Sequence, residues 1–163
     1  EFLFLEEGKA GVISVVTYDG RVAKVQNNGL NESAFDMRDP YRTLWIETAL
    51  GLLPYFLHEN PKTAFVVGYG GGVTAQALTY TDLESIRVVE LEPAIIDASR
   101  ALHQGWPPAL ADARVRLDIN DARNTLRVDP QRYDVIASQP SHPWRAGAAN
   151  VFTQQFFEIV RSR

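Results

Sequence analysis

The 163-residue chain contains no cysteine, and this absence excludes several kinds of site. Without thiols there are no disulfide staples, no cysteine-ligated zinc or iron–sulfur clusters and no thiol nucleophile in it. The chain also lacks a basic excess, because 16 Lys and Arg residues face 20 Asp and Glu residues and the net charge is −4. Affinity for nucleic acid depends on cationic contacts to phosphates, so we expect no nucleic-acid partner.

Long apolar runs are missing as well. No stretch approaches the roughly 18 apolar residues that a membrane helix needs. The apolar start Phe2–Leu5 is too short for a signal-peptide core and has no basic flank. Because residue 1 is Glu and not Met, we interpret the chain as a piece of a longer protein. We expect a cytoplasmic domain, either by itself or as the cytoplasmic part of a protein whose membrane segments lie outside this chain.

The composition that is present suits a folded domain, with 45% hydrophobic and 22% charged residues. The first part of the chain predicts β-structure. Val12–Tyr18 is dense in β-branched residues, Arg21–Val25 alternates, and Asp19-Gly20 lies between them. Two such runs around Asp-Gly are a strong hairpin signal. We therefore predict an N-terminal β-hairpin region over residues 1–30.

The remainder of the chain, residues 31–163, alternates between predicted strands and helices. This alternation predicts an α/β domain with a parallel sheet and right-handed crossovers, whose ligands bind at the carboxyl ends of the strands. The predicted strands are Ala64–Val67, Ile86–Val89, Arg114–Leu117 and Tyr133–Ala137, and the predicted helices are Thr43–Leu57, Thr74–Thr79, Ala94–Leu102, Asp121–Leu126 and one opened by Thr153.

A glycine-rich loop, Gly68-Tyr69-Gly70-Gly71-Gly72, joins the first of these strands to the next helix. Glycines there allow positive φ and close approach of a ligand, and a helix N-terminus favours negative or electron-rich groups. Val73 stands where a dinucleotide fingerprint has its last glycine, which disfavours NAD and FAD, and no Lys-Ser or Lys-Thr follows to make a P-loop. The Gly-x-Gly-x-Gly form is typical of S-adenosylmethionine-binding domains, and a mere tight turn is the alternative.

Two acidic residues follow the next two strands. Glu90 ends the second strand and can accept hydrogen bonds from both ribose hydroxyls of a nucleoside. The alternative is a carboxylate that caps the next helix, a role that suits Glu92 better. Asp121 follows the third strand and can accept from an adenine amino group, or it can be a helix N-cap.

His142 lies in a polar loop after the fourth strand, where a reaction would take place. It can act as a general base near neutral pH, or it can be an exposed loop histidine. His58, His103 and His142 show no metal-ligand spacing, so we expect no metal.

Taken together, these motifs resemble the spermidine synthase family, the polyamine aminopropyltransferases. The resemblance covers most of the chain, and one segment is closest to a bacterial branch of spermidine-synthase-like proteins. The family motifs are His58–Lys62, the glycine loop, Val89–Pro93, Asp121–Arg123, Tyr133–Ile136 and Phe152–Phe157, and the segment of the bacterial branch is Pro140–Gly147.

The resemblance implies an S-adenosylmethionine-methyltransferase-like, Rossmann-like α/β domain behind the N-terminal hairpin region, with further strands after the last helix that this chain does not reach. It implies decarboxylated S-adenosylmethionine or a relative as co-substrate, a small-molecule amine as acceptor, and a homodimer. The implied ligand residues are Gly68 and Gly70 of the loop with Gly71 beside them, Glu90 for the ribose, and Asp121 with Ala122 for the adenine.

Three acidic residues of the family are replaced in this chain. The family has an Asp where this chain has Gly71, and two acids where it has Gln139 and His142. Those acids hold a cationic diamine and take the proton from its attacking nitrogen, whose pKa is about 10. Here His142 would be the base or a substrate contact, and Gln139 would orient the substrate. Three hypotheses stay open: aminopropyl transfer, methyl transfer from S-adenosylmethionine, and a non-catalytic nucleoside-binding module.

Overall fold

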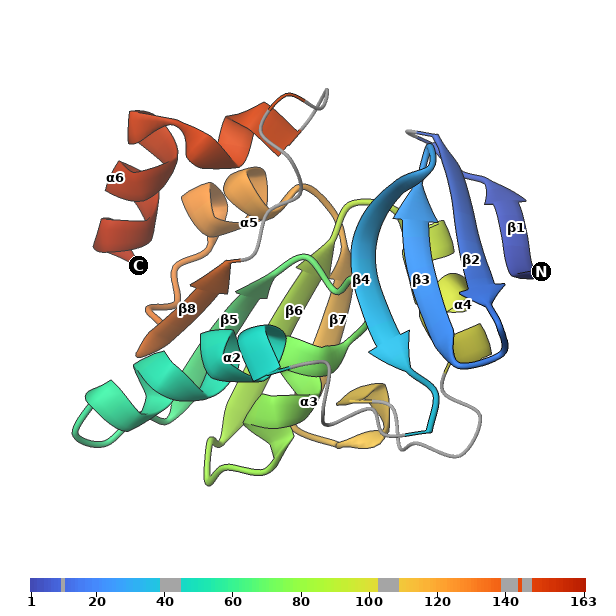
Figure 1. Ribbon diagram of the computed structural model, residues 1–163. Helices are drawn as coiled ribbons and strands as arrows, with labels where there is room; N and C mark the ends of the chain where they lie inside the picture. The colour runs from blue at the N-terminus through green and yellow to red at the C-terminus, as the bar shows by residue number, and fades with distance from the viewer. Residues whose placement is uncertain (10, 39–44, 103–108, 139–143, 145–147) are drawn as a thin grey trace.

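The computed structural model describes residues 1–9, 11–38, 45–102, 109–138, 144 and 148–163 (Figure 1). Its first part is an antiparallel sheet of β1 (Phe2–Glu7), β2 (Val12–Tyr18), β3 (Val22–Asn27) and β4 (Leu30–Asp36), in that spatial order. The predicted hairpin is confirmed as β2 and β3, which pair antiparallel.

Two short turns join the last three strands of this sheet. Asp19, Gly20 and Arg21 connect β2 to β3, and the first two have φ values of 60° and 65°. Asn28 and Gly29 alone connect β3 to β4, with φ values of 50° and 76°. Both pairs match the turns that suit the twist of a hairpin. The sequence did not predict β1 and β4, and the sheet continues past residue 30 to Asp36. The division of the chain into two regions at residue 30 stays a proposal.

The second part is the expected α/β unit with a parallel sheet. Its strands are β5 (Thr63–Val67), β6 (Ser85–Glu90), β7 (Val115–Ile119) and β8 (Val135–Ser138), in the spatial order β7-β6-β5-β8 and all parallel. The helices are α2 (Trp45–Leu57), α3 (Val73–Thr79), α4 (Pro93–Leu102), α5 (Ala122–Val128) and α6 (Gln154–Ser162), with the 3-10 segments η1 (Ala109–Ala111) and η2 (Ala148–Phe152).

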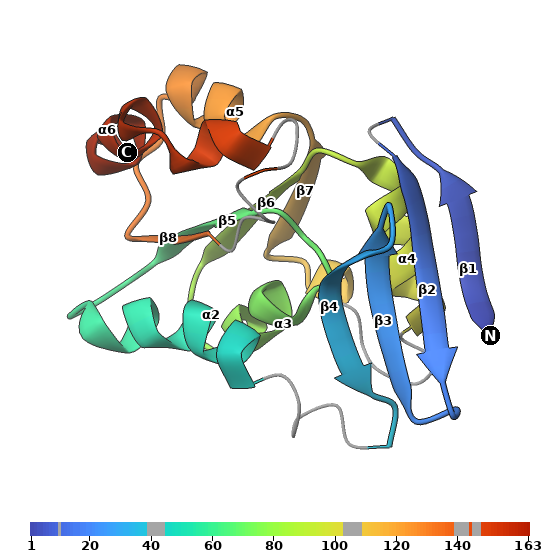
Figure 2. The same ribbon diagram turned by 45° about the horizontal axis from the view of Figure 1, so that its top comes forward.

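Helices cover both faces of the parallel sheet (Figures 1 and 2). Ala64, Val66 and Val88 pack against α3 on one face, and Phe65 and Val67 pack against α5 and α6 on the other. This arrangement explains why the strand sequence is a continuous apolar run, since both faces of β5 are buried. Among the described residues, no helix is both long enough and apolar enough to cross a bilayer.

The antiparallel sheet packs beside α4 (Figure 2). Ile13, Val15 and Phe35 from the sheet lie in one core cluster with Ala94 and Ile95 of that helix. Because α4 follows β6 directly, this packing places β3 and β4 next to the carboxyl end of the parallel sheet. A cavity lies at this junction.

Candidate functional site

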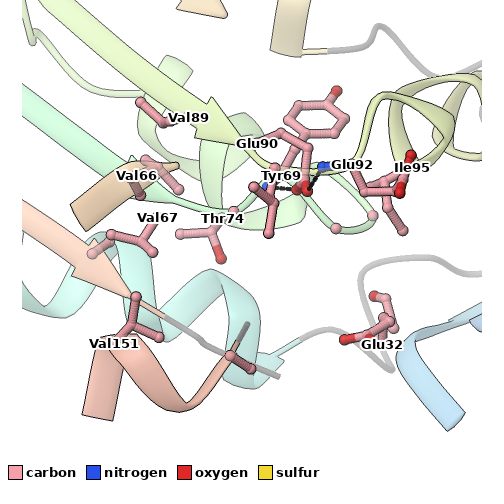
Figure 3. A pocket seen from close by; sticks show the side chains of 18 of the residues that line it. Glu32, Val66, Val67, Tyr69, Thr74, Val89, Glu90, Glu92, Ile95 and Val151 are labelled. Carbon is pink, nitrogen blue, oxygen red and sulfur yellow. Dashed lines mark hydrogen bonds between the residues drawn. The ribbon is translucent and has the colours of Figure 1, made fainter. Parts of the chain in front are cut away.

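The cavity has a volume of about 190 Å³ and lies where the glycine loop, β4, α2 and η2 meet the ends of the parallel strands (Figure 3). The structure brings all six predicted cofactor residues together in its wall. Their role in binding a ligand stays a prediction. These six residues are Gly68, Gly70, Gly71, Glu90, Asp121 and Ala122.

The glycine loop takes a backbone path that side chains disfavour. Gly68 and Gly70 have φ values of 81° and 53°, in the left-handed region. The N–H of Gly68 donates to the carbonyl oxygen of Val89 at 2.8 Å, which ties the start of the loop to β6. The loop is therefore held against the strand end that carries Glu90.

Glu90 is 8% exposed, and its carboxylate organises the loop. Its Oε2 accepts a hydrogen bond from the N–H of Tyr69 at 2.7 Å, and its Oε1 accepts one from the N–H of Glu92 at 2.9 Å (Figure 3). Burial raises the pKa of Glu90, and these backbone N–H groups oppose that effect in part. The N–H groups of Gly70 and Leu91 also lower the pKa of Glu90, so a sugar hydroxyl that donates to this carboxylate would share its oxygens with backbone donors.

Glu92 has the capping role that the sequence suggested for it. Its Oε1 accepts from the N–H of Ala94 at 3.2 Å, in the first turn of α4. A carboxylate at this position stabilises the orphan N–H groups of a helix start. Glu90 therefore stabilises the glycine loop, and Glu92 stabilises the first turn of α4.

Asp121 is the N-cap of α5. Its Oδ1 accepts from the N–H of Asn124 at 2.8 Å, and its backbone is extended, as an N-cap requires. The capping interpretation is therefore correct. Asp121 also lines the cavity, so capping and contact with an adenine amino group are compatible.

Gly71 lies against the antiparallel sheet. A Cβ atom at this position would be 2.2 Å from Cζ of Phe35 and 2.9 Å from Oγ of Ser33. Both distances are far below van der Waals contact. Phe35 and Ser33 of the antiparallel sheet therefore occupy the space that an acidic side chain at position 71, expected from the family resemblance, would need.

Gln139 and His142 lie outside the described residues, so their catalytic roles stay predictions. No group of three or more His, Asp or Glu residues that could hold a metal ion occurs in the part of the chain that the structure describes.

Two acidic residues of the cavity were not predicted from the sequence: Glu32 of β4 and Glu47 in the first turn of α2. Within the described part of the chain, no Lys, Arg or His side chain lines the cavity. The wall therefore carries excess negative charge, which favours a cationic ligand. The acidic lining residues are Glu32, Glu47, Glu90, Glu92 and Asp121.

The fold and the cavity define a methyltransferase-like α/β protein with an acidic cavity at the carboxyl ends of its parallel strands, where such sheets bind their ligands. A sequence model of the spermine/spermidine synthase domain matches residues 45–163. The chain thus belongs to the spermine/spermidine synthase family.

Curated relatives cover two activities. Putrescine N-methyltransferase 2 of Nicotiana attenuata is 29% identical over 148 residues, which are 90% of this chain and 36% of the relative. The polyamine aminopropyltransferase of Streptococcus pneumoniae is 31% identical over 106 residues, 64% of this chain and 37% of the relative. The chain thus spans little more than a third of the length of these relatives.

Solved structures support the fold. A spermidine synthase in complex with the transition-state analogue AdoDATO superposes with a TM-score of 0.86 at 19% identity, over 98% of this chain and 53% of that one. The spermidine synthase of Thermotoga maritima superposes with a TM-score of 0.79 at 18% identity, over 98% of this chain and 51% of that one. The likeness confirms the predicted methyltransferase-like α/β fold.

Proposed function

We propose that the chain is the nucleoside-binding part of an aminopropyltransferase, which moves an aminopropyl group from decarboxylated S-adenosylmethionine to a small-molecule amine. The observation that carries the proposal is the acidic wall of the cavity around the glycine loop. Glu90 would accept from the ribose hydroxyls, Asp121 from the adenine amino group, and Gly68 and Gly70 would let the backbone approach the nucleoside.

The charge of the cavity favours the decarboxylated nucleoside. Decarboxylated S-adenosylmethionine carries a sulfonium and an ammonium group, whereas S-adenosylmethionine adds a carboxylate. Among the described residues the lining holds five acids and no basic side chain, so the ionisable side chains described around a ligand carboxylate would all be acidic. Two unit charges about 4 Å apart interact by about 4 kcal/mol at the effective dielectric of a protein surface, which is enough to decide between the two ligands.

The proposed reaction is a displacement at carbon. The neutral amine nitrogen attacks the carbon next to the sulfonium, the new C–N bond forms, and the C–S bond breaks. The electron pair of that bond goes to sulfur, which leaves as a neutral thioether, and the nitrogen releases a proton. Because the leaving group is already good, the protein mainly positions the reactants. We propose His142 as the proton acceptor and Gln139 as an orienting contact.

Methyl transfer is the second candidate, and one specific observation favours it. The putrescine N-methyltransferase of Nicotiana attenuata matches 90% of this chain, a larger share than the aminopropyltransferase of Streptococcus pneumoniae matches. That reaction takes its methyl group from intact S-adenosylmethionine. The two candidates therefore predict opposite ligand preferences.

Calorimetric titration with the two nucleosides, side by side, tests the proposal. We expect tighter binding of the decarboxylated form and loss of that binding in Glu90→Ala. Glu84→Ala is the matched control, because Glu84 precedes β6 at the opposite edge of the sheet and is exposed. Preference for S-adenosylmethionine would support methyl transfer instead, and unchanged affinity in a folded Glu90→Ala variant would overturn the assigned site.

A further inference from the structure

A β-bulge in β4 turns two neighbouring side chains toward the cavity. Ser33 pairs with Val25 and Asn31 pairs with Gln26, so Glu32 is the extra residue between them. In a regular strand, successive side chains point to opposite faces. Here Glu32 and Ser33 both line the cavity, as a bulge that re-aims a side chain allows. Glu32 lies apart from Glu90, on the side of the cavity that β4 forms (Figure 3).

Two buried polar atoms beside this bulge have no hydrogen-bond partner among the described residues. They are Oγ of Ser33 and Oδ1 of Asn27, in residues that are 7% and 6% exposed. Both residues line the cavity. Buried polar groups in folded proteins are nearly always hydrogen-bonded. The Asn27 oxygen accepts, and the Ser33 hydroxyl accepts or donates, so both can take a hydrogen bond from a ligand that donates.

The neighbouring wall supplies a second carboxylate. Glu47 lies in the first turn of α2 and lines the same cavity. Its backbone oxygen accepts a hydrogen bond from Oγ1 of Thr74 at 3.0 Å, which fixes this turn of α2 against α3. The backbone of Glu47 is thus fixed next to α3, which follows the glycine loop directly.

We propose that Asn27, Glu32, Ser33 and Glu47 form a subsite for a primary ammonium group. An ammonium group has three donors and no acceptor, and the subsite offers two carboxylates, an amide oxygen and a hydroxyl oxygen as acceptors. The subsite takes over the charge that a loop acid would supply, since Phe35 and Ser33 fill the space beside Gly71. This inference rests on the proposed function, which brings a cationic amine into the cavity.

The ammonium group has two sources in the proposed reaction: the aminopropyl chain of the nucleoside and the acceptor diamine. Three titrations distinguish them. Decarboxylated S-adenosylmethionine carries the aminopropyl ammonium, and methylthioadenosine is the same nucleoside without that chain. Putrescine, added to the protein saturated with methylthioadenosine, reports the acceptor alone.

The test variants are Glu32→Gln and Glu47→Gln, with Glu84→Gln as the control outside the cavity. Loss of a charge-assisted hydrogen bond weakens binding by about tenfold to a hundredfold. We expect that loss for decarboxylated S-adenosylmethionine, with the affinity for methylthioadenosine unchanged. The same loss for putrescine alone would assign the subsite to the acceptor amine and would still support it.

A second pair of variants separates ligand contact from folding. Ser33→Ala removes a buried hydroxyl that has no partner among the described residues, so we expect weaker binding of the ammonium ligand at unchanged thermal stability. Thr17→Val removes a buried hydroxyl that the described part of the chain likewise leaves unpaired, from a residue of β2 outside the described lining of the cavity. We expect that variant to bind as the wild type does.

Two results would overturn the inference, and they differ. In the first result, methylthioadenosine binds, and Glu32→Gln and Glu47→Gln keep the wild-type affinity for both decarboxylated S-adenosylmethionine and putrescine. The subsite is then wrong, and the proposed function stands. If the wild type binds neither nucleoside, the proposed function fails and the subsite fails with it.

Discussion

Replacement of Gly71 by alanine is expected to destabilise the protein by pushing the glycine loop away from the antiparallel sheet. The new Cβ would be 2.2 Å from Cζ of Phe35, whereas carbon atoms pack at about 3.5–4.0 Å. The ring of Phe35 is 4% exposed and lies in a core with Ile13 and Val25, so it has little room to withdraw. Overpacking of this kind costs about 1–3 kcal/mol.

For a domain of this size, each kcal/mol shifts the melting temperature by roughly 2–4 °C, so we expect Gly71→Ala to lower it by about 2–12 °C. Calorimetric melting and urea unfolding both measure the effect. Phe35→Ala provides the control, because removal of the ring should abolish most of the additional penalty of Gly71→Ala. A melting temperature lowered by less than about 1 °C, or an equal penalty in both backgrounds, would refute the claim that the sheet fills the space beside Gly71.

Further predictions concern the carboxylates of Glu90, Asp121 and Asp134 and the oligomeric state. Burial raises the pKa of Glu90, and ligand hydroxyls favour its ionised form, so nucleoside binding should weaken as the pH falls through that raised pKa. Near or below that pKa, binding should also release a proton, which titration in two buffers of different ionisation enthalpy measures. Asp121→Ala should lower the free energy of unfolding by about 1 kcal/mol, because α5 loses its N-cap. Asp121→Asn should keep the N-cap and weaken only ligand binding. An equal loss of stability in both variants would contradict the capping geometry. The N–H groups of Lys62 and Thr63 lower the pKa of Asp134, so its stabilising effect is present above the ordinary pKa of about 3.9 and is lost as the pH falls through the lowered value. Asp134→Asn should flatten the acid limb of the stability curve, and an unchanged curve would contradict the assignment. The homodimer that the family resemblance implies should scatter light at twice the mass of one chain, and a monomer mass at micromolar concentration would exclude it.

Local sequence signals predicted the parallel sheet and one hairpin. The run Ala64–Val67 is apolar throughout because helices cover both faces of β5, and Asp19-Gly20 adopts the positive φ values that a short hairpin turn needs. The sequence carries the same signal at Asn28-Gly29, which forms the turn from β3 to β4. The next strand, Leu30–Asp36, could not be predicted because a bulge interrupts its alternation of apolar and polar residues. Its formation also depends on pairing with β3.

Some residues of the candidate site could also be predicted from the sequence, and others could not. Glu90 and Asp121 could be found because parallel strands place their carboxyl ends at one edge of the sheet. Glu32 and Glu47 could not, since their approach to the cavity depends on a register shift in β4 and on the packing of α2 against α3. Both are tertiary features with no periodic signal in the sequence. The crowding beside Gly71 is likewise visible only once Phe35 is placed.

A crystal structure of the protein with decarboxylated S-adenosylmethionine tests the central claim most directly. We predict that the ribose hydroxyls donate to the carboxylate of Glu90, and that the ammonium group of the aminopropyl chain lies within hydrogen-bond distance of Glu32 or Glu47. A nucleoside bound outside this cavity, or one whose ribose makes no contact with Glu90, would contradict the account.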